Sequence, residues 1–151
     1  MKFLTALLVM TTLALCNFAC VAQPSGVYSK AQSDISHFNN ALAQPVKFGS
    51  FRVLVELREG KKSERFWLNH VRRDENKYIG VLETAPRLLS TFKLRQEIQL
   101  EPTEILDWNY ESRVTRTIYG HYNACEDFKA LPTDEATEQI TYWRLACAPS
   151  D

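Results

Sequence analysis

The amino-acid sequence predicts an α+β fold, a curved antiparallel sheet of about five or six strands with an N-terminal and a C-terminal helix. Apolar residues recur at helical spacing over residues 28–43 and again from residue 133. Between these segments, from residue 51 onward, apolar and polar residues alternate with the period of a strand. The length of 151 residues leaves room for one domain of ordinary size.

The first 22 residues have the organisation of an export signal. Lys2 supplies a positive start, and the apolar run that follows it is too short to remain in a membrane as a spanning helix. Small residues at Cys20 and Ala22 fit cleavage after Ala22. We therefore expect a signal peptide over residues 1–22, a single α+β domain over residues 23–151, a periplasmic location and no integral membrane span.

A lipid-anchored form is an alternative that this segment leaves open. Cys16 and Cys20 could each be the modified cysteine of a bacterial lipoprotein. However, the bulky Leu15 precedes Cys16, and Asn17 stands three residues before Cys20. Cleavage after Ala22, which releases a soluble chain, fits the sequence better.

The balance of charged residues argues against some classes of partner. The predicted mature part holds 129 of the 151 residues, with 17 of the 18 basic side chains and all 18 acidic ones. It lacks the positive excess that nucleic-acid or anionic-membrane binding usually needs, so we expect no nucleic-acid partner. A composition of 45% hydrophobic and 24% charged residues is typical of an ordinary globular domain.

Two cysteines remain beyond the predicted signal, Cys125 and Cys147, in a chain sent to an oxidising compartment. We expect them to form a disulfide, which closes a loop of about 23 residues and stabilises the fold by roughly 3 kcal/mol. A pair of buried free thiols is the alternative. We predict no metal site and no cofactor, because the histidines lack the close ligand spacing of a zinc site: His37, His70 and His121.

The first helix is predicted over residues 28–43. Its apolar residues recur at intervals of four, three and four, which places them on one face: Ala31, Ile35, Phe38 and Leu42. Pro45 ends the helix, because a proline disfavours helical backbone in the residue before it.

An antiparallel meander follows the helix. Apolar residues alternate along the first strand, residues 51–58, and Glu59-Gly60-Lys61-Lys62 supplies turn residues. A second strand is predicted at residues 63–71 and a third at residues 78–83. The charged run from Arg72 to Lys77 between them is interpreted as a solvated hairpin tip.

The later strands are shorter. Residues 84–93 are predicted to be irregular, since Pro86 has no backbone donor to offer a sheet. Strands are predicted at residues 97–100, 104–110 and 114–122, the last with residues that share one face: Val114, Ile118, Gly120 and Tyr122.

The final helix is predicted to begin near Thr133, a good N-cap, and the two acidic residues after it suit the positive end of the helix dipole. Apolar residues again recur at intervals of four, three and four: Ala136, Ile140, Trp143 and Cys147. We therefore expect Cys147 on the buried face of this helix. The disulfide would then clamp the last helix to the end of the last strand.

A series of short motifs runs from about residue 50 to residue 122. It comprises an aromatic-Trp-aliphatic strand, a Gly-x-Leu strand, a loop proline and lysine, an Asp-Trp-x-Tyr segment and a Gly-x-Tyr: Phe66-Trp67-Leu68, residues 78–82, Pro86, Lys93, Ile98, residues 105–110 and Gly120-His121-Tyr122. In these motifs the chain resembles the YegJ-like bacterial family, a domain of unknown function. It departs from the family pattern at Arg95-Gln96, where the family tends to place Gly-Asp.

The resemblance implies a small α+β fold and no established catalysis. It also extends to exported proteins that resemble immunity partners of peptidoglycan-cleaving toxins, including amidase effectors of type VI secretion. On this basis we expect a periplasmic immunity protein that binds such a secreted cell-wall-degrading effector and occludes its active site, with a homodimer left open. The alternative is a non-enzymatic envelope accessory or ligand-binding protein with no toxin partner, and a hydrolase is the third hypothesis.

The candidate catalytic residues do not form a recognisable set. Asp107, beside Trp108 and Tyr110, has the composition of a sugar site, but the simpler and stronger interpretation is a core Trp108 and a strand-end acid that caps or pairs. Glycoside hydrolysis needs a second positioned carboxylate, and no spacing identifies one. No serine stands in a Gly-x-Ser-x-Gly motif. We therefore expect a protein that is not an enzyme and has no catalytic residues.

Two segments are the candidate partner-binding sites. In the first, Pro86 restricts a loop in which Leu88 or Leu89 could enter an apolar pocket while Arg87 and Ser90 bind polar groups. The alternative is that both leucines pack under the sheet. The second is the charged tip that begins with Arg72 and Arg73, which could steer a partner or could be an ordinary solvated turn.

Overall fold

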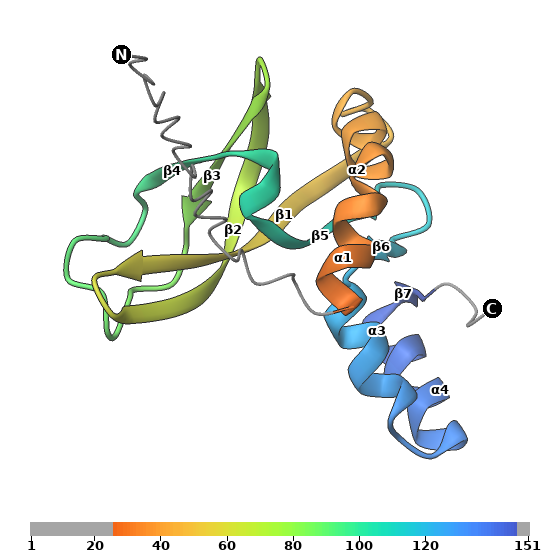
Figure 1. The fold of residues 1–151 in the computed structure, drawn as a ribbon. Helices are drawn as coiled ribbons and strands as arrows, with labels where there is room; N and C mark the ends of the chain where they lie inside the picture. Colours follow the sequence, from red (N-terminus) through yellow and green to blue (C-terminus); the bar gives the residue numbers. More distant parts are fainter. Residues whose placement is uncertain (1–25, 148–151) are drawn as a thin grey trace, which may run out of the picture.

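The computed structural model describes residues 26–147 and confirms the α+β fold (Figure 1). One sheet has the strand order β4-β3-β2-β1-β5-β6-β7, and all neighbours pair antiparallel except β6 and β7. The strands are β1 (Phe48–Glu59), β2 (Lys62–Asp74), β3 (Lys77–Leu82), β4 (Glu97–Leu100), β5 (Ile105–Ser112), β6 (Ile118–Gly120) and β7 (Leu145–Ala146). The helices are α1 (Gly26–Ser33), α2 (Ile35–Leu42), α3 (Tyr122–Lys129) and α4 (Thr133–Trp143), with a 3-10 turn η1 (Pro102–Glu104).

The sheet thus has one strand more than the sequence predicted, the two-residue β7. The meander of the first three strands forms where expected, although β1 and β2 are longer than predicted. Their apolar positions face each other across the register, as in the pairs Val53 with Leu68 and Val55 with Phe66. Gly60 adopts a φ of +59° in the turn between them, a conformation that glycine adopts without strain.

The core lies between the sheet and the two N-terminal helices. Phe38 of α2 is fully buried, and its ring lies 5.6 Å from that of Trp108 and 6.2 Å from that of Tyr78. The indole Nε1 of Trp108 donates to the carbonyl oxygen of Ala31 in α1 at 2.7 Å. Both a strand and a helix are therefore fixed by the same aromatic side chain.

The first helix is broken, unlike the continuous helix predicted over residues 28–43. Asp34 interrupts it directly after Ser33, the last residue of α1, because short polar side chains compete with helical hydrogen bonding. The carboxylate of Asp34 also accepts a hydrogen bond from the hydroxyl of Tyr122 at 2.7 Å, which holds the break against α3. The predicted apolar face survives, since Ala31 and Phe38 are fully buried.

The strand predicted at residues 114–122 is wrong in length. Only Ile118–Gly120 form β6, while Val114 lies in a turn with 86% of its surface exposed. Tyr122 instead begins α3, a helix that the alternating pattern did not reveal. Gly120 fixes this change of direction: its φ is +81°, and a Cβ there would lie 2.3 Å from the carbonyl oxygen of Trp108.

The final helix begins at Thr133, but Pro132 rather than Thr133 occupies the N-cap position. No residue of α4 is buried, and Trp143 is 51% exposed. The predicted buried face is therefore wrong, because α4 packs beside α3 and β7 and makes little contact with the main sheet. Cys147 lies after β7 and not on the helix.

The predicted signal peptide, and the alternative lipid attachment at Cys16 or Cys20, lie outside the described residues. In the part of the chain that the structure describes, no helix is both long enough and apolar enough to cross a membrane.

Candidate functional site

The segment between β3 and β4, residues 83–96, contains neither helix nor strand and projects from the sheet (Figure 1). Its ends lie close together, since the backbone N–H of Arg95 donates to the carbonyl oxygen of Leu82 at 2.7 Å and Leu82 N–H donates to Gln96 at 2.9 Å. A compact loop with closed ends is an Ω-loop, a class that often carries function. We call this segment the 83–96 loop.

Two carboxylates of the β1–β2 hairpin hold the backbone of the 83–96 loop. Glu64 in β2 accepts hydrogen bonds from the backbone N–H groups of Arg87 at 3.1 Å and Leu88 at 3.0 Å. Glu59, at the end of β1, accepts the Ser90 N–H at 2.5 Å and the Ser90 hydroxyl at 2.7 Å. These bonds from Ser90 hold the pKa of Glu59 below its ordinary value, as expected where hydrogen bonds favour the charged form.

The two leucines of this loop have opposite environments. Leu89 is 3% exposed and belongs to the hydrophobic core, whereas Leu88 is 55% exposed. Of the two interpretations made from the sequence, packing into the core applies to Leu89 and exposure to Leu88. Leu89 is therefore not presented to a partner and instead anchors the loop.

Arg87 and Ser90, the two loop residues predicted to bind polar groups of a partner, also differ in their environments. Arg87 is exposed, and its guanidinium makes no ion pair with the described residues. The Ser90 hydroxyl is already bonded to Glu59, so Ser90 shapes the loop. The surface that the loop offers to another molecule is centred on Arg87 and Leu88.

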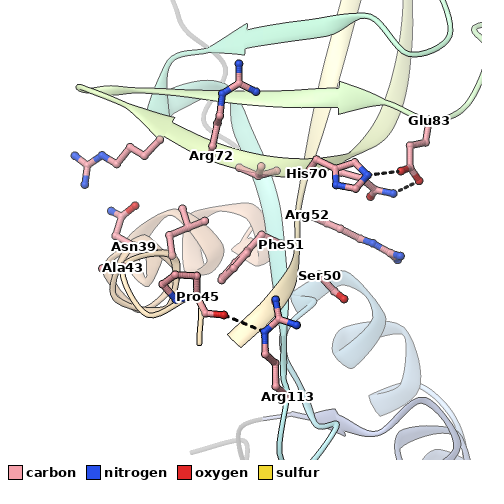
Figure 2. A pocket seen from close by; sticks show the side chains of 15 residues that line it. Asn39, Ala43, Pro45, Ser50, Phe51, Arg52, His70, Arg72, Glu83 and Arg113 are labelled. Carbon is pink, nitrogen blue, oxygen red and sulfur yellow. Dashed lines mark hydrogen bonds and ion pairs between the residues drawn. The ribbon is translucent and has the colours of Figure 1, made fainter. Parts of the chain in front are cut away.

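Arg72 and Arg73 lie within β2, since the hairpin turn itself is confined to residues 75 and 76. Arg72 makes two hydrogen bonds to the carboxylate of Glu97, at 2.8 and 3.0 Å. Arg73 donates from Nε to the carbonyl oxygen of Glu75 at 3.0 Å. Both side chains border an open cavity of about 890 Å³ (Figure 2).

This cavity also contains residues that the sequence did not single out. Arg52 comes from β1, His70 from β2, Glu83 from the start of the 83–96 loop and Arg113 from the turn after β5. They are separated by many residues in the chain, and no short motif links them. The one hint in the sequence is Gly49, which leaves room for the Arg113 guanidinium. That contact exists only once the chain has folded, so the sequence alone could not reveal it.

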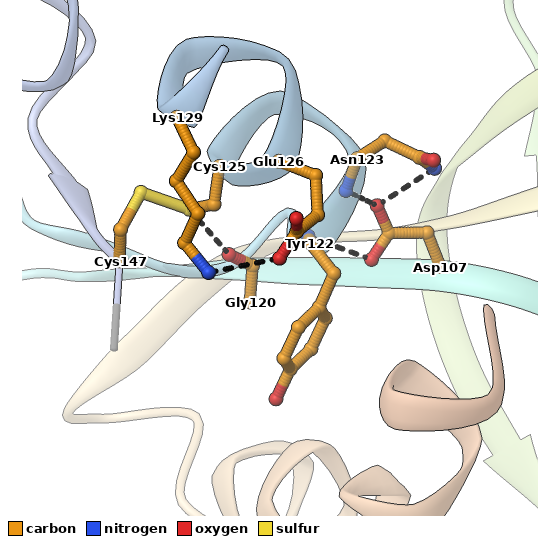
Figure 3. The surroundings of a disulfide bond; sticks show 8 residues. All are labelled: Asp107, Gly120, Tyr122, Asn123, Cys125, Glu126, Lys129 and Cys147. Atoms are coloured by element: carbon orange, nitrogen blue, oxygen red, sulfur yellow. Dashed lines mark hydrogen bonds and ion pairs between the residues drawn. A yellow bond between two sulfur atoms is a disulfide. The ribbon is translucent and has the colours of Figure 1, made fainter. Parts of the chain in front are cut away.

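A third cluster surrounds Asp107, which is fully buried in β5. Its Oδ1 accepts the backbone N–H of Tyr122 at 3.1 Å, and its Oδ2 accepts the N–H of Asn123 at 3.0 Å (Figure 3). Burial raises the pKa of Asp107, while these N–H groups act in the opposite direction. Asp107 therefore caps α3, in line with the simpler of its two interpretations.

His121 precedes α3 with a φ of +59°, and its ring lies 4.9 Å from that of Trp67. The buried Nδ1 of His121 has no hydrogen-bond partner among the described residues. Burial lowers the pKa of His121, which Asp107 partly offsets.

Cys125 and Cys147 are joined by a disulfide, as the sequence predicts (Figure 3). The bond connects α3 to the residue after β7, and not the last helix to the last strand. The correction has two parts: Cys125 lies in α3 and not at the end of a strand, and Cys147 lies beyond α4. A disulfide of this kind is compatible with a location outside the cytoplasm.

A family model described as "Uncharacterized protein conserved in bacteria (DUF2314)" matches residues 25–144. The chain is also 30% identical over 91 residues to "Uncharacterized protein YegJ" of Escherichia coli (strain K12). That alignment covers 59% of this chain and 57% of the relative, so little more than half of the relative's length is matched. No solved structure matches the chain. Since the family model spans most of the sequence, the chain belongs to this family of bacterial proteins, as its YegJ-like motifs indicated.

Proposed function

We propose that this protein is a periplasmic immunity protein, which binds a secreted peptidoglycan-degrading effector of the amidase type and occludes its active site without catalysing a reaction. The observation that carries the proposal is the 83–96 loop. It presents an exposed leucine, Leu88, from a backbone held on both sides.

Rigid mounting favours inhibition because a loop that is already ordered loses less conformational entropy when it binds. Leu89 anchors the loop in the hydrophobic core, while Glu64 and Glu59 of the β1–β2 hairpin hold its backbone by hydrogen bonds. Leu88 is then available to fill an apolar pocket at the centre of an interface, where most of the binding free energy is concentrated.

Arg87 adds a polar contact beside that leucine. Its guanidinium has no ion pair among the described residues, so it can bind a carboxylate in an effector's cleft without breaking an existing pair. The disulfide between Cys125 and Cys147 also supports work in an oxidising compartment, where the effector's substrate lies.

The proposal is tested with the effector encoded by a gene adjacent to this one. Cells that express that effector in the periplasm should survive when they also produce this protein. The double variant Arg87→Glu with Leu88→Asp should abolish both protection and binding in calorimetry, while the melting temperature stays nearly unchanged.

A control changes an exposed apolar residue elsewhere. Val114→Asp, in the turn after β5, should leave protection and binding intact. If no effector gene lies nearby and deletion of this gene sensitises cells to no secreted toxin, the immunity role is wrong. The cavity bordered by Arg72 and Arg73 would then favour the second candidate, an envelope ligand-binding protein.

A further inference from the structure

The cavity beside β1 and β2 lies at two interruptions of the sheet. The register shifts between Gly49 and Arg52 in β1 and between Asn69 and Arg72 in β2. At each shift a non-glycine residue has a positive φ, Ser50 at 51° and His70 at 50°. β-Bulges of this kind change the direction of neighbouring side chains. Here they border a cavity of about 890 Å³ beside the C-terminal end of α2.

Arg113 is held in place at the border of the cavity (Figure 2). Its Nε donates to the carbonyl oxygens of Pro45 at 2.9 Å and Phe48 at 3.1 Å. The guanidinium also lies against Gly49, where an added Cβ would come within 2.9 Å of Nη2. These contacts fix the guanidinium but leave its positive charge without a carboxylate partner among the described residues.

The charges around the cavity are strongly unequal. Four arginines line it against a single acid, Glu83, and that acid is engaged by Asn69 and His70. Arg72 is paired with Glu97. Three guanidiniums therefore carry uncompensated charge in the described structure: Arg52, Arg73 and Arg113.

The lining is also apolar in part. Phe51, Leu42 and the buried Val71 contribute hydrocarbon surface. The hydroxyl of Tyr78 donates to Oδ1 of Asn39 at 2.7 Å, and this leaves the Asn39 amide nitrogen as a further donor at the border. A cavity of this size, with partly apolar walls and a few placed donors, has the character of a small-molecule site.

We infer that this cavity binds a small amphiphilic anion, whose carboxylate or phosphate group lies against Arg113 and whose apolar body lies on Phe51. Arginine suits such a group because its planar guanidinium can donate two parallel hydrogen bonds. Arg52 and Arg73 also line the cavity, and the Arg52 side chain points away from Phe51 (Figure 2), so these two add only longer-range attraction. This site uses none of the residues that the proposed inhibitory loop presents.

The test is a titration of the ¹⁵N-labelled protein with 1-naphthyl phosphate, which combines a phosphate with an apolar ring system. Binding should saturate, with the largest shifts in residues 39–52, 69–73 and 113. Inorganic phosphate alone should bind at least tenfold more weakly. Phosphate that binds as tightly as 1-naphthyl phosphate would overturn the amphiphilic site.

Three variants locate the binding. Arg113→Gln should weaken binding at least tenfold, and Gly49→Ala should do the same with every charge retained, because the new Cβ displaces the Arg113 guanidinium. The flexible end of that side chain can move, so Gly49→Ala should remain folded by circular dichroism. Arg116→Gln, a residue outside the cavity, should bind as the unmodified chain does.

Equal binding by all of these variants would overturn the proposal, as would shifts scattered over the surface. A membrane is the other source of phosphate groups beside apolar material. Sedimentation with phosphatidylglycerol vesicles, without saturable binding of 1-naphthyl phosphate, would likewise overturn the small-molecule site.

Discussion

The carboxylate of Asp107 caps α3 from fifteen residues upstream, with its Oδ1 accepting the backbone N–H of Tyr122 at 3.1 Å. The other oxygen accepts both the backbone N–H and the side-chain amide of Asn123, at 3.0 and 3.1 Å. A residue in the middle of a strand thus supplies the cap that His121, at the N-cap position, does not. This one side chain thus ties the start of α3 to β5, beside the Tyr122–Asp34 hydrogen bond and the disulfide that also hold the helix.

We therefore predict that Asp107→Ala lowers the free energy of unfolding by about 2 to 4 kcal/mol, since it leaves buried N–H groups without acceptors. Urea unfolding followed by circular dichroism measures the loss. Asp127→Asn, on the exposed side of α3, is the control and should change stability by less than about 0.5 kcal/mol. Equal stability of both variants would contradict the capping role.

The partly buried His121 should make stability depend on pH. Its pKa in the folded chain is lowered from 6.5, so the unfolded chain binds a proton more readily below that pH. The contribution of His121 is present above 6.5 and is lost as the pH falls through the lowered pKa. The slope should stay below about 1.4 kcal/mol per pH unit, the limit for one proton.

Urea unfolding at a series of pH values between about 7.5 and 5 measures this slope. His121→Asn should flatten it, and asparagine tolerates the positive φ at this position. His37→Asn, an exposed residue in α2, is the control and should keep the slope. A slope that survives in His121→Asn would assign the pH dependence to another group.

The disulfide should stabilise the fold measurably. Its cysteines are 22 residues apart, so the entropy of loop closure predicts a contribution of about 3 kcal/mol. The double variant Cys125→Ser with Cys147→Ser should therefore melt at a lower temperature than the oxidised chain. A reducing agent should lower the melting temperature of the unmodified chain and leave that of the variant unchanged, and the same response in both would contradict the assignment.

The neighbouring leucines of the 83–96 loop should respond oppositely to truncation. Leu89→Ala should cost about 2 to 5 kcal/mol of unfolding free energy, because it removes a side chain from the core. Leu88→Ala should change stability by less than about 0.5 kcal/mol. Chemical unfolding of the two variants distinguishes them, and a large loss for Leu88→Ala would contradict the exposed position of Leu88.

Local periodicity predicted the elements whose partners lie nearby in the chain. The alternation in β1 and β2 identified the hairpin, since each strand buries one face against the same core. After residue 113 it identified α4 but missed α3, and it assigned α4 a buried face that the structure lacks, because α4 packs on α3 and β7. Periodicity reports that a residue favours burial, but not which element buries it.

In the candidate site, too, the sequence predicted what depends on neighbouring residues and missed what depends on distant ones. The composition of residues 85–91 predicted a partner-binding loop, but the choice between Leu88 and Leu89 depended on the position of the β1–β2 hairpin. The cavity escaped prediction because two bulges create it, and its arginines come from separate strands and turns. Residue spacing within one segment cannot show that side chains from distant segments line the same cavity.

The bond from Trp108 to Ala31 joins residues 77 positions apart, and it lies at the centre of the core. Contacts of such long range are slow to form, because a large stretch of chain has to be brought together before any of them is gained. Until β5 has been made, α1 lacks its partner Trp108 and α2 is covered only by β1 and β3, through Phe51 and Tyr78, so apolar surface stays open to unwanted association. The chain therefore acquires its native state late, after most of its length is present, and a fragment that stops before Trp108 should remain unfolded.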